Sequence, residues 1–302
     1  MILELSQNCN LDCIMCGFGG KPILASGFMP QELIEKIIGN RDFLSSLEEI
    51  RLNGRGESSL YPDFTQILQR IAGCFPGVRL SLFTNLMFED ETILDNLLKY
   101  HVELLISVDS PNKANYEYIR RGANFELLIN RLEKLSGAFL VFTLQTSNID
   151  EIRDIGKFAN QYHLGLILNI VRTDNEDYRK NFQNLIDVKW DAILNQLSDL
   201  HGIIPPKRLL IPDQIWGKRI PDSITTTVSC GSLDVCPNLL SEIMIANNGI
   251  VYTCNMFNPQ IFGNIYEKDL EKIWISPERL NFVDHYKENY YCKNCEYMIL
   301  HT

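Results

Sequence analysis

Six short apolar segments alternate with helical patterns along the first 172 residues of the chain. The segments are rich in leucine and β-branched residues without polar alternation, as expected for parallel strands that helices cover. They read ILELS, EIRLNG, VRLSLFTN, VELLISVDS, AFLVFTLQT and LGLILNIV. Six βα units are too few for the closed eight-unit barrel. The pattern therefore predicts a partial (β/α)6 barrel of the α/β class, with its chemistry at the carboxyl ends of the strands.

The sequence changes character after a polar helical stretch that runs from Asp174 to Leu200. A proline-containing connector, GIIPPKRLLIP, leads to a hairpin pattern in which two apolar strands flank residues 247–249. We expect residues 1–212 to form the barrel with its helical connector, and residues 213–302 to form a small α+β domain. That second part has little apolar core, so a bound metal cluster would supply the missing stability.

Eight of the nine cysteines fall into two groups. Three lie on the loop after the first strand: Cys9, Cys13 and Cys16. Five lie in the last quarter of the chain: Cys230, Cys236, Cys254, Cys292 and Cys295. Cys74 stands between the groups, and we expect it to be a small buried hydrophobe. The grouping predicts two metal sites.

Charge and hydrophobicity narrow the classes of partner and the compartment. The formal net charge of −10 argues against nucleic acid or an anionic membrane as the main partner, because both need a concentrated basic face. No secretory signal or bilayer-spanning apolar run is present, so we expect a cytoplasmic protein whose cysteines are reduced. The substrate should then be a small molecule or a peptide.

The first cysteine group has C-x3-C-x2-C spacing. A structural zinc ion takes four protein ligands, and no fourth Cys or His lies near this loop, so zinc would need a remote ligand. Three thiolates on a 4Fe–4S cubane leave one iron open for a substrate or cofactor. Here the sequence resembles the radical SAM family, which usually has a partial (β/α)6 barrel. The family motif C-x3-C-x-Φ-C, with Φ bulky and apolar, is matched by Cys9, Cys13, Met15 and Cys16.

Further segments at the strand ends resemble motifs of that family. LNGRGESS resembles its glycine-glycine-glutamate motif, whose backbone and carboxylate engage the amino group of S-adenosylmethionine; Gly56 and Glu57 match, and Arg55 replaces the first glycine. FTN, SVDS and YIRRGANFE resemble the places from which side chains reach the cofactor ribose and carboxylate. The resemblance thus implies further cofactor-binding candidates: Thr84, Asn85, Ser107, Asp109, and Arg120 or Arg121. Taken singly, each could instead cap a turn or helix or face solvent.

The resemblance implies a definite reaction. A reduced cluster passes one electron into S-adenosylmethionine, which breaks into methionine and a 5′-deoxyadenosyl radical, and that radical takes a hydrogen atom from a substrate carbon. An electron donor such as flavodoxin or ferredoxin would reduce the cluster. The protein must hold the substrate carbon close to the radical and exclude water and oxygen, which suits a barrel mouth covered by a second domain.

The second cysteine group closely resembles the twitch extension, the shorter relative of the SPASM domain. Four cysteines of that extension hold one auxiliary iron–sulfur cluster, which we expect to be 4Fe–4S. The matching residues are Cys236, Cys254, Cys292 and Cys295. The further cysteines of a full SPASM domain are missing before Thr302. A four-cysteine zinc ribbon is the alternative, because C-x2-C is also a zinc half-site.

Cys230 is left over, with three possible roles: a cluster ligand, an idle neighbour, or a thiol that returns a hydrogen atom to a substrate radical. The last role would resemble some radical SAM epimerases, whereas an auxiliary cluster that accepts an electron would resemble the twitch dehydrogenases of aminocyclitols. Epimerisation and dehydrogenation are therefore both open, with Cys230 as the catalytic candidate.

The expected substrate is a small polar metabolite such as a sugar or an aminocyclitol. The first strand begins almost at the N-terminus, which leaves no room for the separate leader-binding domain of many peptide-modifying relatives. A first alternative is a maturase that epimerises or crosslinks a ribosomally made peptide. A second, of another class, is a non-catalytic iron–sulfur or zinc scaffold protein.

Overall fold

The computed structural model describes residues 1–16, 27–172, 175–226, 236–252, 254 and 260–293. Six parallel strands correspond to the six segments expected from the sequence. Their bounds are β1 (Ile2–Leu3), β3 (Glu49–Arg51), β4 (Arg79–Thr84), β5 (Glu103–Ser107), β7 (Phe139–Leu144) and β8 (Gly165–Ile170). Each pairs in parallel with the next in this order, and β9 (Leu209–Leu210) adds a further parallel strand beside β8. The α/β partial barrel is confirmed.

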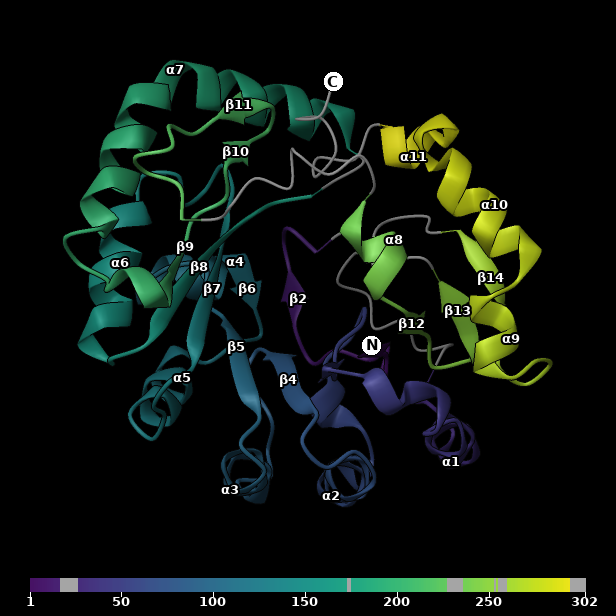
Figure 1. Ribbon diagram of the computed structural model, residues 1–302. Coiled ribbons are helices and arrows are strands. Elements are labelled where there is room, and N and C mark those ends of the chain that lie inside the picture. The colour runs from purple at the N-terminus through teal and green to yellow at the C-terminus, as the bar shows by residue number, and fades with distance from the viewer. Residues whose placement is uncertain (17–26, 173–174, 227–235, 253, 255–259, 294–302) are drawn as a thin grey trace.

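The connecting helices lie on the outer side of this curved sheet (Figure 1). Their bounds are α1 (Gln31–Gly39), α2 (Phe64–Cys74), α3 (Thr92–Lys99), α5 (Phe125–Leu132) and α6 (Ile152–Gln161). The longer α7 (Glu176–Leu200) follows β8. A short helix that the sequence analysis did not anticipate, α4 (Lys113–Ile119), lies between β5 and the next outer helix. Cys74, at the end of α2, is half-buried rather than buried.

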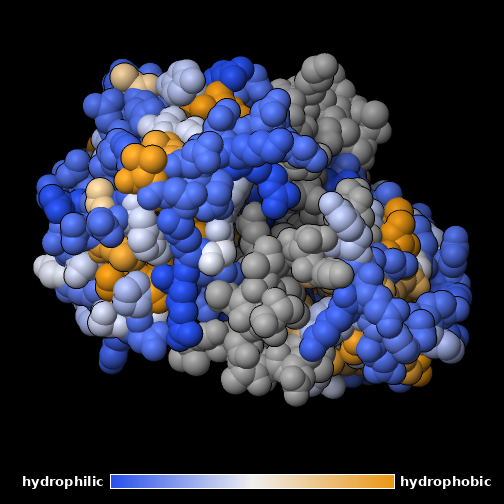
Figure 2. All heavy atoms as spheres, turned by 90° about the horizontal axis from the view of Figure 1, so that it is seen from above, coloured by the Kyte–Doolittle hydropathy of each residue, from blue (hydrophilic) through white to orange (hydrophobic). Residues whose placement is uncertain are grey.

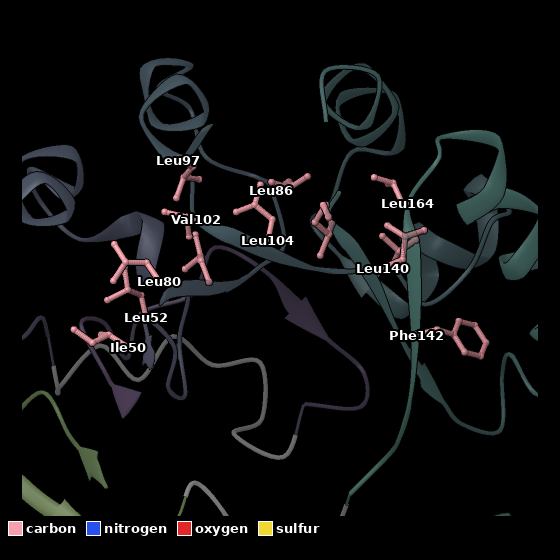
Figure 3. Close-up of a cluster of buried hydrophobic side chains, with 14 of the residues drawn as sticks. Ile50, Leu52, Leu80, Leu86, Leu97, Val102, Leu104, Leu140, Phe142 and Leu164 are labelled. Carbon is pink, nitrogen blue, oxygen red and sulfur yellow. The ribbon is translucent and has the colours of Figure 1, made fainter. Parts of the chain in front are cut away.

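Apolar side chains at helical spacing hold these helices on the sheet. In α2 the buried residues are Phe64, Ile67, Leu68 and Ile71, which form a single stripe. Figure 3 shows part of the resulting layer, where Leu97 of α3 lies near Val102, just before β5, and Leu104 of β5 lies near Leu86. Each fully buried side chain of this kind contributes roughly 1.5–3 kcal/mol. The layer therefore fixes the sheet that carries the loops at its carboxyl edge.

The C-terminal part extends the same sheet instead of forming a separate one. Its strands are β12 (Met244–Ile245), β13 (Ile250–Tyr252) and β14 (Ile261–Asn264), and its helices α8 (Pro237–Ser241), α9 (Leu270–Trp274), α10 (Pro277–His285) and α11 (Tyr290–Lys293). β12 and β13 form the expected hairpin, and Gly249 takes a positive φ of 82° in its turn. β12 also pairs in parallel with β1, which gives the strand order β14-β13-β12-β1-β3-β4-β5-β7-β8-β9. The domain boundary after residue 212 stays a prediction.

Two small ribbons complete the described strands: β2 (Asp12–Cys13) with β6 (Arg120–Arg121), and β10 (Gln214–Ile215) with β11 (Lys218–Arg219). β2 lies on the inner side of the curved sheet (Figure 1). The surface seen from above is largely hydrophilic where it is described, with scattered apolar patches (Figure 2). Of the helices that the structure describes, none combines the length and the apolar character needed to cross a membrane.

Candidate functional site

The loop that carries the first three cysteines runs along the inside of the barrel. Its thiols, Cys9, Cys13 and Cys16, are all half-buried. Burial is the main cause that raises the pKa of the Cys13 thiol to about 11, and the nearby thiols of Cys9 and Cys16 add to it, whereas Arg120 opposes it. Burial also raises the pKa of Cys9, although the backbone N–H of Leu11 opposes this by hydrogen bonding. The three thiols therefore share one loop, and burial makes two of them, Cys9 and Cys13, harder to deprotonate.

Two side chains from neighbouring loops donate to these sulfurs. Asn85, directly after β4, places its Nδ2 3.9 Å from Cys9 Sγ and 2.9 Å from Asn10 Oδ1. Arg120 of β6 places its Nη1 3.9 Å from Cys13 Sγ. These residues, expected to reach the cofactor, thus also contact the cysteine loop.

Arg120 is held by a buried ion pair. Its Nη2 lies 2.7 Å from Asp109 Oδ2, and the side chains are only 8% and 0% exposed. Burial lowers the pKa of Arg120, but the combined opposing effects of its neighbours, Asp109 first among them, leave that pKa raised, so the guanidinium stays cationic. Arg121, by contrast, is exposed and pairs with Asp12 at 3.4 Å. The structure therefore distinguishes two arginines that the sequence left as equal candidates.

The loop after β3 packs against the cysteine loop through glycine. A Cβ added to Gly56 would lie within 3 Å of the backbone of Gln7 and Asn8. The amide of Glu57 donates to the carbonyl of Asn8 at 2.8 Å in the same contact. Because backbone atoms cannot move aside as a flexible side chain can, position 56 requires glycine for this close approach.

The Glu57 carboxylate is buried at the junction of two loops. Its Oε1 accepts hydrogen bonds from the hydroxyls of Ser59 at 2.8 Å and Thr84 at 2.9 Å, and its Oε2 accepts from the amide of Asn85 at 2.8 Å. Burial raises the pKa of Glu57, against the effect of these hydrogen bonds. Glu57 and Thr84 therefore bind each other in this structure, and their contact with the cofactor stays a prediction.

The sequence analysis missed two buried charged residues that shape the site. Glu4 is fully buried, and its carboxylate accepts hydrogen bonds from the amide of Arg55 at 2.8 Å and from Gln7 Nε2 at 2.6 Å. Arg131 of α5 is 2% exposed and donates to the carbonyls of Leu86 and Phe88, in the loop that begins with Asn85. Each interrupts an apolar pattern, ILELS or FELLINRL, and that interruption was the available signal.

The remaining candidates are placed as follows. Ser107 ends β5 and is half-buried, and Met15 packs partly buried against the core. Of the second cysteine group, Cys236 precedes α8, Cys254 follows β13 and Cys292 lies in α11; all three are half-buried. Cys230 and Cys295 lie outside the described residues.

The residues around the first loop fit an iron–sulfur cluster and a polar cofactor. Thiolates are soft ligands that suit such clusters, and a buried cation beside them offsets negative charge. In a 4Fe–4S cluster each thiolate binds a different iron, so the ligands need not converge on one point. Within the described ranges, no three His, Cys, Asp or Glu side chains converge as they would around a single metal ion. Several buried polar atoms of the described chain also have no hydrogen-bond partner, among them Ser58 Oγ, Tyr116 Oη and Arg120 Nε. Such atoms are costly unless a bound group satisfies them.

Comparison with protein families gives two matches. The family model of the radical SAM superfamily matches residues 3–159. The model of the SPASM iron–sulfur cluster-binding domain matches residues 236–296.

Two curated relatives are informative. The chain is 26% identical to the mycofactocin maturase MftC of Mycolicibacterium smegmatis, over 56% of this chain and 43% of that protein. It is 21% identical to the tungsten-containing aldehyde ferredoxin oxidoreductase cofactor-modifying protein of Pyrococcus furiosus, over 98% of this chain and 85% of that protein. The chain thus spans less than half the length of the first relative and most of the second.

Solved structures share the fold at low sequence identity. The anSMEcpe structure with bound AdoMet has a TM-score of 0.63 at 19% identity and covers 99% of this chain and 86% of that one. Streptococcus suis SuiB bound to S-adenosylmethionine has a TM-score of 0.70 at 12% identity, over 99% and 71%. BtrN in complex with AdoMet and 2-DOIA has a TM-score of 0.56 at 15% identity, over 98% and 91%.

Proposed function

Because the chain belongs to the radical SAM superfamily, we propose that it uses a 5′-deoxyadenosyl radical to take a hydrogen atom from a carbon of a peptide substrate. Membership of this family implies that the chain binds S-adenosylmethionine and a 4Fe–4S cluster, and the SPASM match implies that it binds auxiliary iron–sulfur clusters. The observation that carries the proposal is the set of three half-buried thiols on one loop, next to Asn85 and Arg120.

The chemistry that the bound cluster supplies is one electron, which breaks a carbon–sulfur bond of S-adenosylmethionine to give methionine and the radical. The residues of this chain have other tasks. Cys9, Cys13 and Cys16 would hold the cluster. Gly56 lets the neighbouring backbone approach that loop, and the buried pair of Arg120 and Asp109 keeps a cation in place beside it. Burial of these groups limits the access of water.

The relatives support a peptide as the substrate. SuiB has been solved bound to the precursor peptide SuiA, and anSMEcpe with a peptide named Cp18Cys. MftC is a maturase by name. The small polar metabolite expected from the sequence is not supported by these relatives. It stays the second candidate, favoured by the BtrN complex with 2-DOIA. A flavodoxin or ferredoxin as electron donor and a cytoplasmic location also stay predictions.

Fractionated extract tests the substrate class. The reconstituted protein would be incubated without oxygen with S-adenosylmethionine and dithionite. Either the peptide fraction or the small-molecule fraction of an extract from cells that naturally contain this protein would then be added. A peptide substrate should raise 5′-deoxyadenosine formation above the rate without extract, and pretreatment of the fraction with protease should abolish the rise. Stimulation by the protease-resistant small-molecule fraction alone would overturn the peptide proposal and favour a metabolite.

The reaction type is proposed to be epimerisation, with Cys230 as the hydrogen donor. The radical takes one hydrogen atom from the substrate carbon, and the Cys230 S–H bond then breaks to give a hydrogen atom to the opposite face. The resulting thiyl radical regains an electron and a proton from the reducing system and solvent. Dehydrogenation is the alternative, for which the auxiliary cluster that Cys236, Cys254, Cys292 and Cys295 would hold would serve as the electron acceptor and solvent as the proton acceptor.

A further inference from the structure

We propose that Asn85 and Arg120 are positioning residues that donate N–H···S hydrogen bonds to the cluster ligands Cys9 and Cys13 and thereby raise the reduction potential of the cluster. This inference rests on the proposed function, because it presupposes that the first three cysteines hold the cluster. It gives both residues a task that binding of the cofactor ribose or carboxylate would not require.

The carboxamide of Asn85 can face Cys9 in only one orientation. Its Oδ1 accepts a hydrogen bond from the amide of Met87 at 2.7 Å, while its Nδ2 donates to Asn10 Oδ1 at 2.9 Å. Asn10 Nδ2 in turn donates to the carbonyl of Met87 at 2.5 Å. A flipped amide would set two oxygens and two N–H groups against each other. The donor side of Asn85 therefore lies toward Cys9 Sγ, 3.9 Å away.

Arg120 is brought to Cys13 by the backbone. In the antiparallel pair of β2 and β6, Cys13 lies directly opposite Arg120, and the amide of Ile14 donates to the carbonyl of Ile119 at 2.9 Å. Asp109 then holds one side of the guanidinium through Nη2, and the amide of Thr143 holds Asp109 Oδ1 at 2.8 Å. The other side, Nη1, is left toward Cys13 Sγ at 3.9 Å.

Hydrogen bonds to the sulfurs and nearby charge are among the factors that set the potential of an iron–sulfur cluster. Reduction adds negative charge, so N–H donors and a cation stabilise the reduced form more than the oxidised one. The pair of Arg120 and Asp109 is almost inaccessible to water, so solvent screens it little. The Asp109 charge offsets that of Arg120. Removing the arginine should therefore lower the reduction potential, and removing the aspartate charge should raise it.

The test is a redox titration of the full chain with both clusters reconstituted, in which electron paramagnetic resonance measures the fraction of reduced cluster at each potential. The cluster held by the first three cysteines is identified by the change that S-adenosylmethionine causes in its signal, because only an open iron can bind it. Arg120→Gln should reduce the ratio of reduced to oxidised cluster about tenfold at the wild-type midpoint, which is 59 mV for one electron. Asn85→Asp should also lower the potential, whereas Asp109→Asn should raise it.

Arg121→Gln is the matched control. It removes an arginine and an ion pair from the same strand, but Arg121 is paired with Asp12 at the surface instead of contacting a sulfur. Its potential should equal that of the wild type. Arg120→Lys keeps an N–H donor and should recover part of the loss.

Each outcome decides the matter. A wild-type reduction potential in Arg120→Gln would overturn the inference. Weaker binding of S-adenosylmethionine by the same variant would then make Arg120 a ligand of the cofactor. Failure of both Arg120 variants to assemble the cluster, while Arg121→Gln succeeds, would also overturn it, since Arg120 would then be needed to build the site. A wild-type protein without any S-adenosylmethionine-responsive cluster would instead refute the proposed function.

Discussion

Glu57 Oε2 accepts the backbone amide hydrogen of Asn85 at 2.8 Å, although α2 and β4 separate the two residues along the chain. The bond joins the loop after β3 to the loop after β4. Since Asn85 also contacts Cys9, the Glu57 carboxylate is linked to that thiol through a single residue, in addition to the direct hydrogen bond from the Glu57 amide to Asn8. The Glu57 carboxylate therefore holds two loops of the site together, and its expected contact with the cofactor stays a prediction.

Glu57→Gln should destabilise the folded chain by about 1–3 kcal/mol, because an amide nitrogen cannot accept the hydrogen bonds that the carboxylate accepts. Urea unfolding of the cluster-free protein measures this, with Glu35→Gln, an exposed glutamate paired with Arg70, as the control that should change little. Binding of S-adenosylmethionine should weaken by a few kcal/mol at most. Unchanged stability would show that the buried network contributes nothing, and unchanged affinity that Glu57 is not a cofactor ligand.

Gly56→Ala should cost about 1–3 kcal/mol of unfolding free energy, because the new Cβ would overlap the backbone of Gln7 and Asn8. Gly73→Ala in α2 is the control, since its Cβ would meet nothing within 4 Å. That variant should gain roughly 0.5–1 kcal/mol from helix propensity. Equal unfolding midpoints for the two variants would contradict the close packing of the two loops.

Replacing Cys9, Cys13 and Cys16 together with alanine should abolish cleavage of S-adenosylmethionine and leave the auxiliary cluster. Iron per chain should fall from about eight to about four after anaerobic reconstitution, if both sites hold four irons. Iron analysis and 5′-deoxyadenosine chromatography measure the two effects. Native protein that contained zinc and no iron would refute both cluster assignments.

Cys230→Ala separates the three roles of the surplus thiol. If Cys230 donates the hydrogen atom, the variant should bind both clusters and form 5′-deoxyadenosine but give no inverted product. In deuterated water the wild type should then place one deuterium at the inverted carbon, as mass spectrometry of the product would show. Loss of about one cluster's worth of iron would instead make Cys230 a ligand, and a product lighter by two hydrogens would indicate dehydrogenation.

Glu49 should make the free energy of unfolding depend on pH in the acidic range. Burial opposes its ionisation, but hydrogen bonds from Arg51, Ser81 and Arg79 lower its pKa to about 2. A carboxylate with a lowered folded-state pKa stabilises the fold above its unfolded pKa of about 4.5, and this contribution, up to about 3 kcal/mol, is lost as the pH falls toward 2. The difference in unfolding free energy between wild type and Glu49→Gln should therefore be larger at about pH 7 than at about pH 3. A difference independent of pH would rule this out.

Local sequence patterns predicted the barrel strands and outer helices. The contacts between loops depend on pairing between distant segments, which local patterns could not predict. The strands and outer helices follow from apolar runs and helical spacing, which act over a few residues. The ribbon that sets Cys13 opposite Arg120 is two residues long on each side and has no local signature. That ribbon is what distinguishes Arg120 from Arg121. The buried partners of Glu4 and Arg131 likewise depend on loops that meet only in the folded chain.

The parallel pairing of β1 with β12 has a consequence for synthesis on the ribosome. Ile2 lies beside Met244 as well as Arg51, so the first strand stays an open edge until the chain has been translated past residue 244. Contacts this distant raise the contact order and slow folding. An unpaired edge on a nascent chain can also pair with other molecules and aggregate. Chains that terminate before β12 should therefore be prone to aggregate even though every barrel helix is already made.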